Sequence, residues 1–194
     1  MMVGVLDVQG DVAEHVSAAA KACSTMGLNA HVEAVKTPEK IRASSALIIP
    51  GGESTTLGRL MGAYGLDEAV MDVAEDIPVF GTCAGMVVLA KEGDRLKEGQ
   101  RLLGLMDAKI IRNAYGRQRD SFEADLNIPS IGGGRFPGVF IRAPAMEKVW
   151  GRCRSLCEYR GRIVLARQGN LLASAFHPEL TGDTRLHEYF LGLI

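Results

Sequence analysis

The sequence predicts an α/β fold in which a mostly parallel sheet lies between two layers of helices and continues into an antiparallel extension. Through the first half of the chain, short apolar runs alternate with helical patterns, which is typical of a parallel sheet covered on both faces. In the second half, apolar stretches are joined by tight turns at Gly161 and at Gly169 and Asn170, which indicates antiparallel strands. The 194 residues suffice for one core, so we expect a single domain over residues 1–194.

The expected elements follow from the spacing of apolar residues. In the first half we expect strands at 3–8, 29–35, 46–50 and 77–80, and helices at 11–26, 38–43, 55–61, 66–74 and 84–91. Gly27 lies where the C-cap of the first helix would be. In the second half we expect strands at 105–111, 138–142, 156–159, 163–167 and 171–176, and a last helix after Asp183 as its N-cap.

Composition excludes several classes of function. The net charge is −1 and basic residues form no face or block, so we expect no nucleic-acid partner. The longest apolar runs are too short to span a bilayer, and the N-terminus carries no signal-peptide pattern, so we expect a cytoplasmic protein without a membrane partner. The four cysteines match no zinc template, and Cys153 and Cys157 are expected to be ordinary reduced residues. We expect neither a metal nor a cofactor.

The segment Gly81-x-Cys83-x-Gly85 has the pattern of a nucleophile elbow in its cysteine form. In such an elbow a strand turns sharply into a helix, the nucleophile sits at the strained tip, and small neighbours let the chain pass close to itself. Cys83 would then lie at a helix N-terminus, which favours its thiolate. The N–H of Ala84 would point at a developing oxyanion.

A thiol nucleophile needs a base and the base needs an orienting group. His177 and Glu179 directly follow an apolar strand, and residues i and i+2 of an extended segment point to the same side. Pro178 favours the extended conformation at His177. The remaining histidines, His15, His31 and His187, are interpreted as surface or structural residues.

The segment Pro50–Ser54 ends a buried strand with two glycines. The backbone N–H groups of Gly51 or Gly52 can approach a substrate closely there and complete an oxyanion hole. The phosphate-loop pattern G-x-x-x-x-G-K-[ST] and the dinucleotide pattern G-x-G-x-x-G are both absent, so the loop does not indicate a nucleotide site.

With these segments in view, the sequence resembles the class I (triad) glutamine amidotransferases. Within that class it is similar to the glutaminase-subunit family of pyridoxal 5′-phosphate synthase (PdxT/Pdx2), over essentially the whole chain. The segments that carry the resemblance are GVLDVQGD (4–11), EH (14–15), PGGEST (50–55), FGTCAGM (80–86), RNAYGRQ (112–118), DSFE (120–123), FIRAP (140–144) and FHPE (176–179).

The resemblance implies a flavodoxin-like core and a reaction. Cys83 would be the nucleophile, His177 the general base and acid, and Glu179 the carboxylate that orients it. L-glutamine would be held by Gly52, Glu53, Ser54, Arg112, Ile141 and Arg142. The resemblance also implies docking on a larger synthase subunit (PdxS/Pdx1), which typically activates the glutaminase and receives its ammonia through an internal route.

Two alternatives stay open from the sequence. A glutaminase subunit serving histidine or nucleotide synthesis would share Cys83 and His177, but it would lack the QGD and RNAYGRQ segments. A non-catalytic α/β module with a redox-sensing cysteine would keep the elbow, and the His177–Glu179 pair argues against it.

Overall fold

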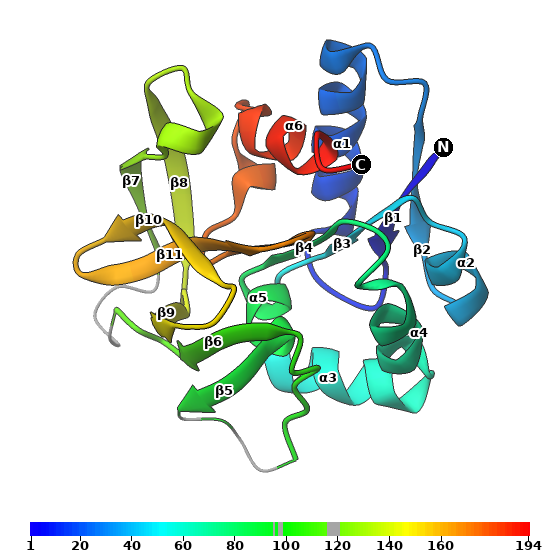
Figure 1. Cartoon of the computed structure of the whole chain (residues 1–194), viewed down its shortest axis with the longest axis horizontal. Coiled ribbons are helices and arrows are strands. Elements are labelled where there is room, and N and C mark those ends of the chain that lie inside the picture. Colours follow the sequence, from blue (N-terminus) through cyan, green and yellow to red (C-terminus); the bar gives the residue numbers. More distant parts are fainter. Residues whose placement is uncertain (95, 97–98, 116–120) are drawn as a thin grey trace.

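Parallel strands occupy the centre of the fold (Figure 1), as seen in a computed structural model that describes residues 1–94, 96, 99–115 and 121–194. Their order is β2-β1-β3-β4-β12, and every neighbouring pair is parallel. The strands are β1 (Met2–Leu6), β2 (His31–Val35), β3 (Ala46–Ile49), β4 (Val79–Thr82) and β12 (Leu171–Ser174). Residues of β3, β4 and β12 are buried throughout, because helices cover both faces of this part of the sheet.

The helices form a layer on each face (Figure 1). One layer holds α1 (Val12–Met26) and α6 (Arg185–Leu191), which pack against each other. The other holds α3 (Ser54–Ala63), α4 (Leu66–Val73) and α5 (Ala84–Leu89), with α2 (Pro38–Arg42) packed on α4. Gly27 ends α1 with φ +66°, the left-handed conformation that glycine adopts at a C-cap without steric cost. No helix in the described ranges is both long and apolar enough to cross a membrane.

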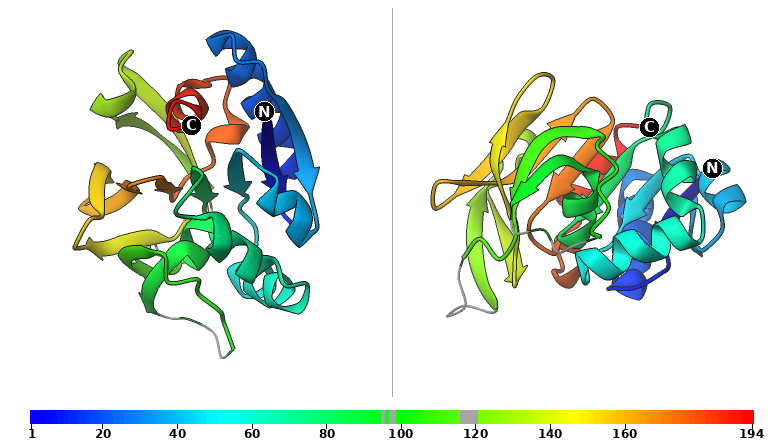
Figure 2. Two further views of the ribbon diagram at one scale, coloured as in Figure 1. Left: turned by 45° about the vertical axis from the view of Figure 1, so that its right-hand side comes forward. Right: turned by 90° about the horizontal axis from the view of Figure 1, so that it is seen from below.

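Beyond β12 the sheet continues with β11, β9, β6 and β5. Here β11 pairs antiparallel with β12, β9 and β10, β9 pairs antiparallel with β6, and β5 runs parallel to β6. A separate antiparallel hairpin of β7 and β8 stands beside this extension (Figure 2). The bounds are β5 (Ala90–Asp94), β6 (Met106–Ile111), β7 (Ser121–Asn127), β8 (Arg135–Ile141), β9 (Ala145–Val149), β10 (Arg154–Tyr159) and β11 (Arg162–Gln168), with 3₁₀ turns η1 (Pro129–Ile131) and η2 (Pro178–Leu180).

The predicted α/β class is confirmed: the central sheet is parallel, lies between helices and carries an antiparallel extension. Three strands, β5, β7 and β9, were absent from the sequence-based prediction, and the expected helix 84–91 ends at Leu89 because Ala90 begins β5. β5 is an edge strand of sequence AKEGD, and edge strands carry charged residues in place of an apolar run. Of the segments quoted above, Gly116, Arg117, Gln118 and Asp120 lie outside the described residues.

The topology brings the ends of four strands together. Because β1, β3, β4 and β12 are parallel, the residues that follow them lie at one edge of the sheet, which is where α/β proteins bind ligands. Gly10 follows β1, Gly51 follows β3, Cys83 follows β4 and His177 follows β12. All four cysteines of the chain are free and buried.

Candidate active site

Cys83 sits at the tip of a sharp turn between β4 and α5. Its backbone has φ 49° and ψ −101°, a strained conformation for a residue with a side chain. Its N–H donates to the carbonyl of Ser174 at 2.8 Å. A Cβ on Gly81 would lie 2.6 Å from the carbonyl carbon of Gly85, and a Cβ on Gly85 would collide with the carbonyl oxygen of Ile49. The predicted elbow is therefore formed, and both glycines are needed for it.

His177 lies beside this thiol. Its Nδ1 is 2.7 Å from Oε1 of Glu179, so the other ring nitrogen is available to the thiol of Cys83, which lines the same pocket. The backbone N–H of His177 donates to the carbonyl of Val139 at 2.8 Å, which fixes the segment after β12. All three side chains of this Cys–His–Glu arrangement are buried.

The electrostatics favour a charged His177–Glu179 pair. Burial by itself would lower the pKa of His177, but its hydrogen bonds to Cys83 and Glu179 outweigh burial and raise this pKa above its usual range. Burial would raise the pKa of Glu179, yet the close imidazoles of His15, 3.3 Å from Oε2, and His177, 2.7 Å from Oε1, hold it at about 2. The imidazole can thus keep a proton taken from the thiol.

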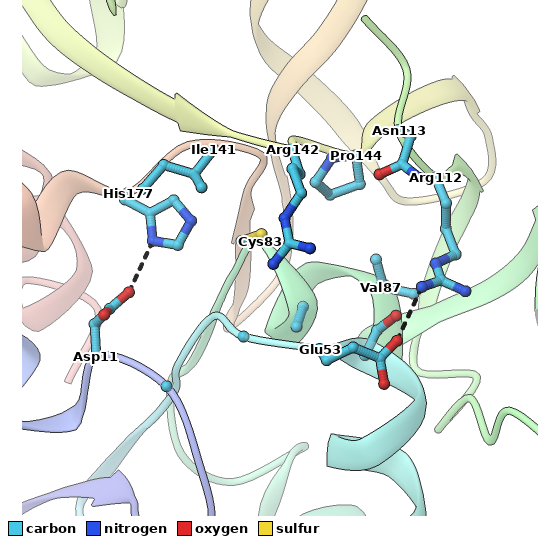
Figure 3. A pocket seen from close by; sticks show the side chains of 14 residues that line it. Asp11, Glu53, Cys83, Val87, Arg112, Asn113, Ile141, Arg142, Pro144 and His177 are labelled. Carbon is cyan, nitrogen blue, oxygen red and sulfur yellow. Dashed lines mark hydrogen bonds and ion pairs between the residues drawn. The ribbon is translucent and has the colours of Figure 1, made fainter. Parts of the chain in front are cut away.

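A second carboxylate faces the same imidazole nitrogen. Oδ2 of Asp11 lies 3.3 Å from Nδ1 of His177 (Figure 3). Within the described ranges, Asp11, His177 and Glu179 form the one group whose ligand atoms are close enough for a metal ion, all within 4.8 Å of one another. Hydrogen bonding around Nδ1 accounts for this spacing, and the absence of a metal or cofactor stays a prediction.

The glycine loop after β3 packs directly against His177 and Cys83. A Cβ on Gly51 would lie 2.6 Å from Cε1 of His177, and Gly52 has φ +118°. The side-chain amide of Gln9 holds the loop in place: its Nε2 donates to the carbonyl of Glu53 at 3.0 Å, and its Oε1 accepts from the N–H of Glu53 at 3.3 Å. The loop is held close enough to line the site with backbone.

The pocket above Cys83 has a volume of about 420 Å³, within the range of small-molecule sites. On one wall Arg112 donates to Oε1 of Glu53 at 3.0 Å and to Oε1 of Gln100 at 3.1 Å. On the other the guanidinium of Arg142 projects beside Cys83 (Figure 3). The backbones of Asn113 and Arg142 have φ 49° and 41°, so strain is concentrated around this pocket.

A model of the SNO glutamine amidotransferase family matches residues 5–194. The chain belongs to the SNO glutamine amidotransferase family. It is 49% identical to pyridoxal 5′-phosphate synthase subunit PdxT of Methanosarcina acetivorans, over 100% of this chain and 98% of the relative. The subunit PdxT of Archaeoglobus fulgidus is 47% identical over 100% and 98%, and that of Thermococcus onnurineus is 48% identical over 98% of each chain.

Two solved structures of glutamine amidotransferases share the fold of this chain. A crystal structure of a glutamine amidotransferase superimposes with a TM-score of 0.86 at 46% identity, over 98% of this chain and 97% of the other. A glutamine amidotransferase from Thermotoga maritima gives a TM-score of 0.62 at 14% identity, over 99% and 83%. The second likeness shows the fold alone.

In this SNO family member the residues predicted from the sequence lie together. Those that line the pocket are Gly52, Glu53, Ser54, Cys83, Ala84, Arg112, Ile141, Arg142 and His177. Two do not line it: Glu179 lies behind His177, and Gly51 packs against the imidazole. Their roles in binding and catalysis remain proposals.

Gln9, Asp11 and His15 are at the site but are not assigned a role by the sequence prediction. The same holds for four further residues that line the pocket: Gly10, Val87, Asn113 and Pro144. Gln9 and Asp11 lie in the loop between β1 and α1, so the rule that ligands bind at the carboxyl ends of parallel strands could have pointed to them. His15 is four residues after Asp11, and thus on the same face of α1. Among the histidines interpreted as surface or structural, His15 and His187 are buried and His31 is exposed.

Proposed function

We propose that this chain hydrolyses L-glutamine to L-glutamate and ammonia, with Cys83 as nucleophile, His177 as general base and acid, and Glu179 as the orienting carboxylate. The observation that carries the proposal is that the buried Cys83 and His177 line the floor of one pocket, and that Nδ1 of this His177 lies 2.7 Å from Oε1 of the buried Glu179. A nucleophile bonded to a base that is itself oriented by a carboxylate is the arrangement that covalent catalysis needs.

In the first half-reaction, His177 takes the thiol proton and the Cys83 sulfur attacks the side-chain amide carbon of glutamine. Negative charge develops on the amide oxygen, and the N–H groups of Ala84 and of Gly52 or Gly51 are the proposed donors. Each donor is expected to lower the barrier by about 3 kcal/mol. His177 then gives its proton to the amide nitrogen, the C–N bond breaks, ammonia leaves and a thioester remains on Cys83.

In the second half-reaction, water attacks the thioester carbon while His177 accepts its proton. The C–S bond breaks, glutamate leaves, and the thiol regains its proton from the imidazole. Glu179 stays ionised throughout, because the hydrogen bonds it accepts hold its pKa at about 2, and its charge favours the imidazolium formed in each half-reaction.

Charged side chains on two walls of the pocket are complementary to the α-carboxylate and the ammonium group of free glutamine. We assign the substrate α-carboxylate to Arg142, whose guanidinium projects into the pocket (Figure 3) and can bind a carboxylate through two N–H donors. Arg112 already bonds Glu53 and Gln100, so it is better placed to support the wall. Glu53 is ionised, since hydrogen bonds from Thr55 and Thr56 outweigh burial and hold its pKa at about 2, and it can attract the substrate ammonium.

The names of the relatives support a proposal for which enzyme uses the ammonia. Proteins 46–50% identical to this chain are named pyridoxal 5′-phosphate synthase subunit PdxT, and a subunit implies a partner. We infer that the chain docks on a PdxS-type synthase subunit and supplies ammonia for pyridoxal 5′-phosphate synthesis.

A glutaminase assay tests both parts. Ammonia release should increase when a PdxS-type subunit is added, and Cys83→Ala should abolish release in its presence. Cys157→Ala is the matched control, because Cys157 is buried, and burial raises its pKa to about 11. Full activity of the Cys83→Ala variant would refute the mechanism. If a different synthase activated the chain and a PdxS-type subunit did not, the proposed partner would be wrong, whereas the proposed hydrolysis mechanism would stand.

A further inference from the structure

Behind Glu179, on the side away from the pocket, lies a buried pair of histidines that the proposed mechanism does not use. His15 from α1 is fully buried, and its Nε2 lies 3.0 Å from Oγ1 of Thr82 and 3.3 Å from Oε2 of Glu179. His187 from α6 is also fully buried, and its Nε2 lies 3.3 Å from Nδ1 of His15. Thr82 directly precedes Cys83. His15 therefore contacts both the nucleophile strand and the base segment.

The positions of the hydrogens follow from the partners. If Nδ1 of His15 carried the proton, its Nε2 lone pair would face Oε2 of Glu179, and the Nδ1–H of His187 would be buried without an acceptor. If Nε2 of His15 carries the proton, it donates toward Thr82 and Glu179, and the Nε2–H of His187 donates to Nδ1 of His15. The atoms of this cluster that then lack a hydrogen bond within the described ranges are two acceptors, Nδ1 of His187 and Oε2 of Glu179, and an unpaired acceptor is the smaller cost. Oε2 still has Nε2 of His15 as a close electrostatic contact at 3.3 Å.

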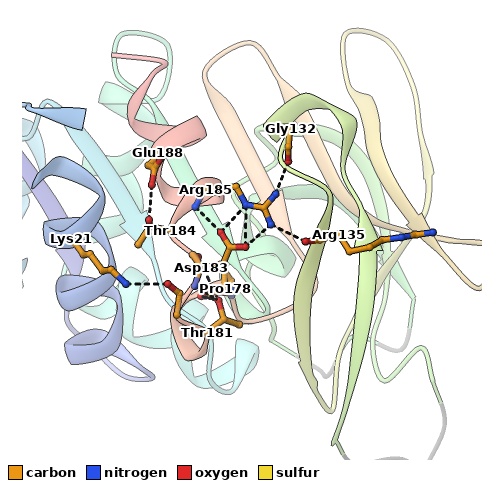
Figure 4. Close-up of polar contacts among 10 residues, drawn as sticks. Lys21, Gly132, Arg135, Pro178, Thr181, Asp183, Thr184, Arg185 and Glu188 are labelled. Carbon is orange, nitrogen blue, oxygen red and sulfur yellow. Dashed lines mark hydrogen bonds and ion pairs between the residues drawn. The ribbon is translucent and has the colours of Figure 1, made fainter. Parts of the chain in front are cut away.

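His187 can fix the tautomer of His15 because helix α6 is held in place and the imidazole of His187 stays neutral. Arg185, two residues earlier in α6, donates to the carboxylate of Asp183 and to the backbone carbonyls of Gly132 and Arg135 (Figure 4). Burial and the nearby His15 lower the pKa of His187 to about 3. A neutral imidazole has one donor and one acceptor, so it can select the tautomer of its neighbour.

We propose that His15 is a positioning residue for glutamine hydrolysis: its Nε2–H holds the second oxygen of Glu179, and His187 fixes the tautomer that makes this possible. The carboxylate is then held between two imidazoles, with Oε1 on His177 and Oε2 on His15. The inference rests on the proposed function of the Cys83–His177–Glu179 triad and adds a residue that touches neither substrate nor thiol.

The charges around Glu179 make the consequence of losing His15 specific. The carboxylate of Glu179 bonds the imidazole of His177. Other titratable groups near this pair are Asp11 before α1, Glu14 and Lys21 on α1, and His187 on α6. Lys21 donates to the carbonyl of Gly182 at 3.1 Å and not to Glu179. Without His15 the buried carboxylate keeps one close donor, so its pKa must rise and its protonated, inactive form must extend to higher pH.

The test compares His15→Leu with His15→Gln in the complex with the activating synthase subunit. Leucine fills the site without a donor, whereas the glutamine amide can place an N–H near the position of Nε2. We expect kcat to fall about 10- to 100-fold in His15→Leu, the usual effect of losing a hydrogen bond to a charged group, with KM unchanged and the acidic limb of the pH profile moved to higher pH. His15→Gln should recover most of kcat and the wild-type limb. His31→Leu, at an exposed histidine, is the control.

A second measurement does not depend on any variant folding. In the ¹⁵N spectrum of the wild-type chain, His15 should be protonated at Nε2, and His187 should be protonated at Nε2 and bare at Nδ1. The opposite tautomers would overturn the proposal, as would equal kcat values and pH limbs in His15→Leu and wild type. Absence of glutaminase activity in the wild-type complex would instead refute the proposed function.

Discussion

Gly51 and His177 are packed so closely that a Cβ on the glycine would lie 2.6 Å from Cε1 of the imidazole and 3.3 Å from the Cβ of Cys83. The loop after β3 thus limits where the imidazole can lie. A bulkier residue must move the base, the loop or both, and each of these moves disturbs the proposed oxyanion hole.

Gly51→Ala is therefore expected to lower kcat at least 100-fold, since losing one oxyanion donor alone costs 10²–10³-fold, while unfolding in urea changes little. The matched control is Gly182→Ala, because a Cβ at Gly182 meets nothing within 4 Å. Wild-type kcat in Gly51→Ala would show that this close packing has no catalytic role.

The strained backbone of Cys83 predicts an unusual order of stabilities. At φ 49° and ψ −101° a Cβ is unfavourable, so Cys83→Gly should be more stable than Cys83→Ala by about 1 kcal/mol or more. In an ordinary helix position the order is reversed. Chemical denaturation of both inactive variants measures the difference, and a more stable alanine variant would mean that the elbow stores no strain.

The two carboxylates on Nδ1 of His177 should differ in importance. Glu179 is buried at 2.7 Å, while the side chain of Asp11 is 39% exposed at 3.3 Å. Glu179→Gln should lower kcat on the order of 10³-fold or more, as expected for the orienting member of a triad, and Asp11→Asn less than about 10-fold, since water screens an exposed charge. Steady-state assays of both variants decide this. A larger loss from Asp11→Asn would exchange their roles.

Substrate recognition by Arg142 is tested through KM. Arg142→Met should raise KM for glutamine about 10-fold or more with a smaller change in kcat, because the bond to the α-carboxylate is the same in ground and transition states. Assays of Arg142→Met and Arg112→Met side by side separate direct binding from support. An effect on KM confined to Arg112→Met would reassign the carboxylate to that residue.

Stability should fall in mildly acidic solution because of His187. In the unfolded chain its pKa is about 6.5, whereas in the folded chain it is about 3. Between these values the unfolded state binds a proton that the folded state excludes, so the free energy of unfolding decreases as pH falls, by about 2 kcal/mol at pH 5. Urea unfolding of wild type and His187→Phe at pH 7 and pH 5 should show a smaller decrease in the variant.

Local patterns were sufficient to predict that the candidate nucleophile lies in an elbow and that its candidate base lies beside a carboxylate. The Gly81–Gly85 turn and the His177–Glu179 spacing each depend on a few adjacent residues, and the structure forms both. Strands β5 and β7 were missed because neither is an apolar run of the central sheet: β5 is a charged edge strand, and among the described residues β7 pairs with β8 alone. The single-domain boundary over residues 1–194 remains a prediction.

The sequence by itself determined the fold class, the elbow at Cys83 and the candidate base, because each is carried by short-range order: strand and helix periodicity, glycines at a tight turn, and alternate side chains on one face. The family followed from the resemblance of whole segments. Only the tertiary structure decided which groups surround that base. His15 and Thr82 are 67 residues apart. Their contact with each other, and that of His15 with Glu179, exist because parallel strands bring distant chain ends to one edge and α1 packs beside them. Burial then makes each hydrogen bond there matter, since a group removed from water has no other partner.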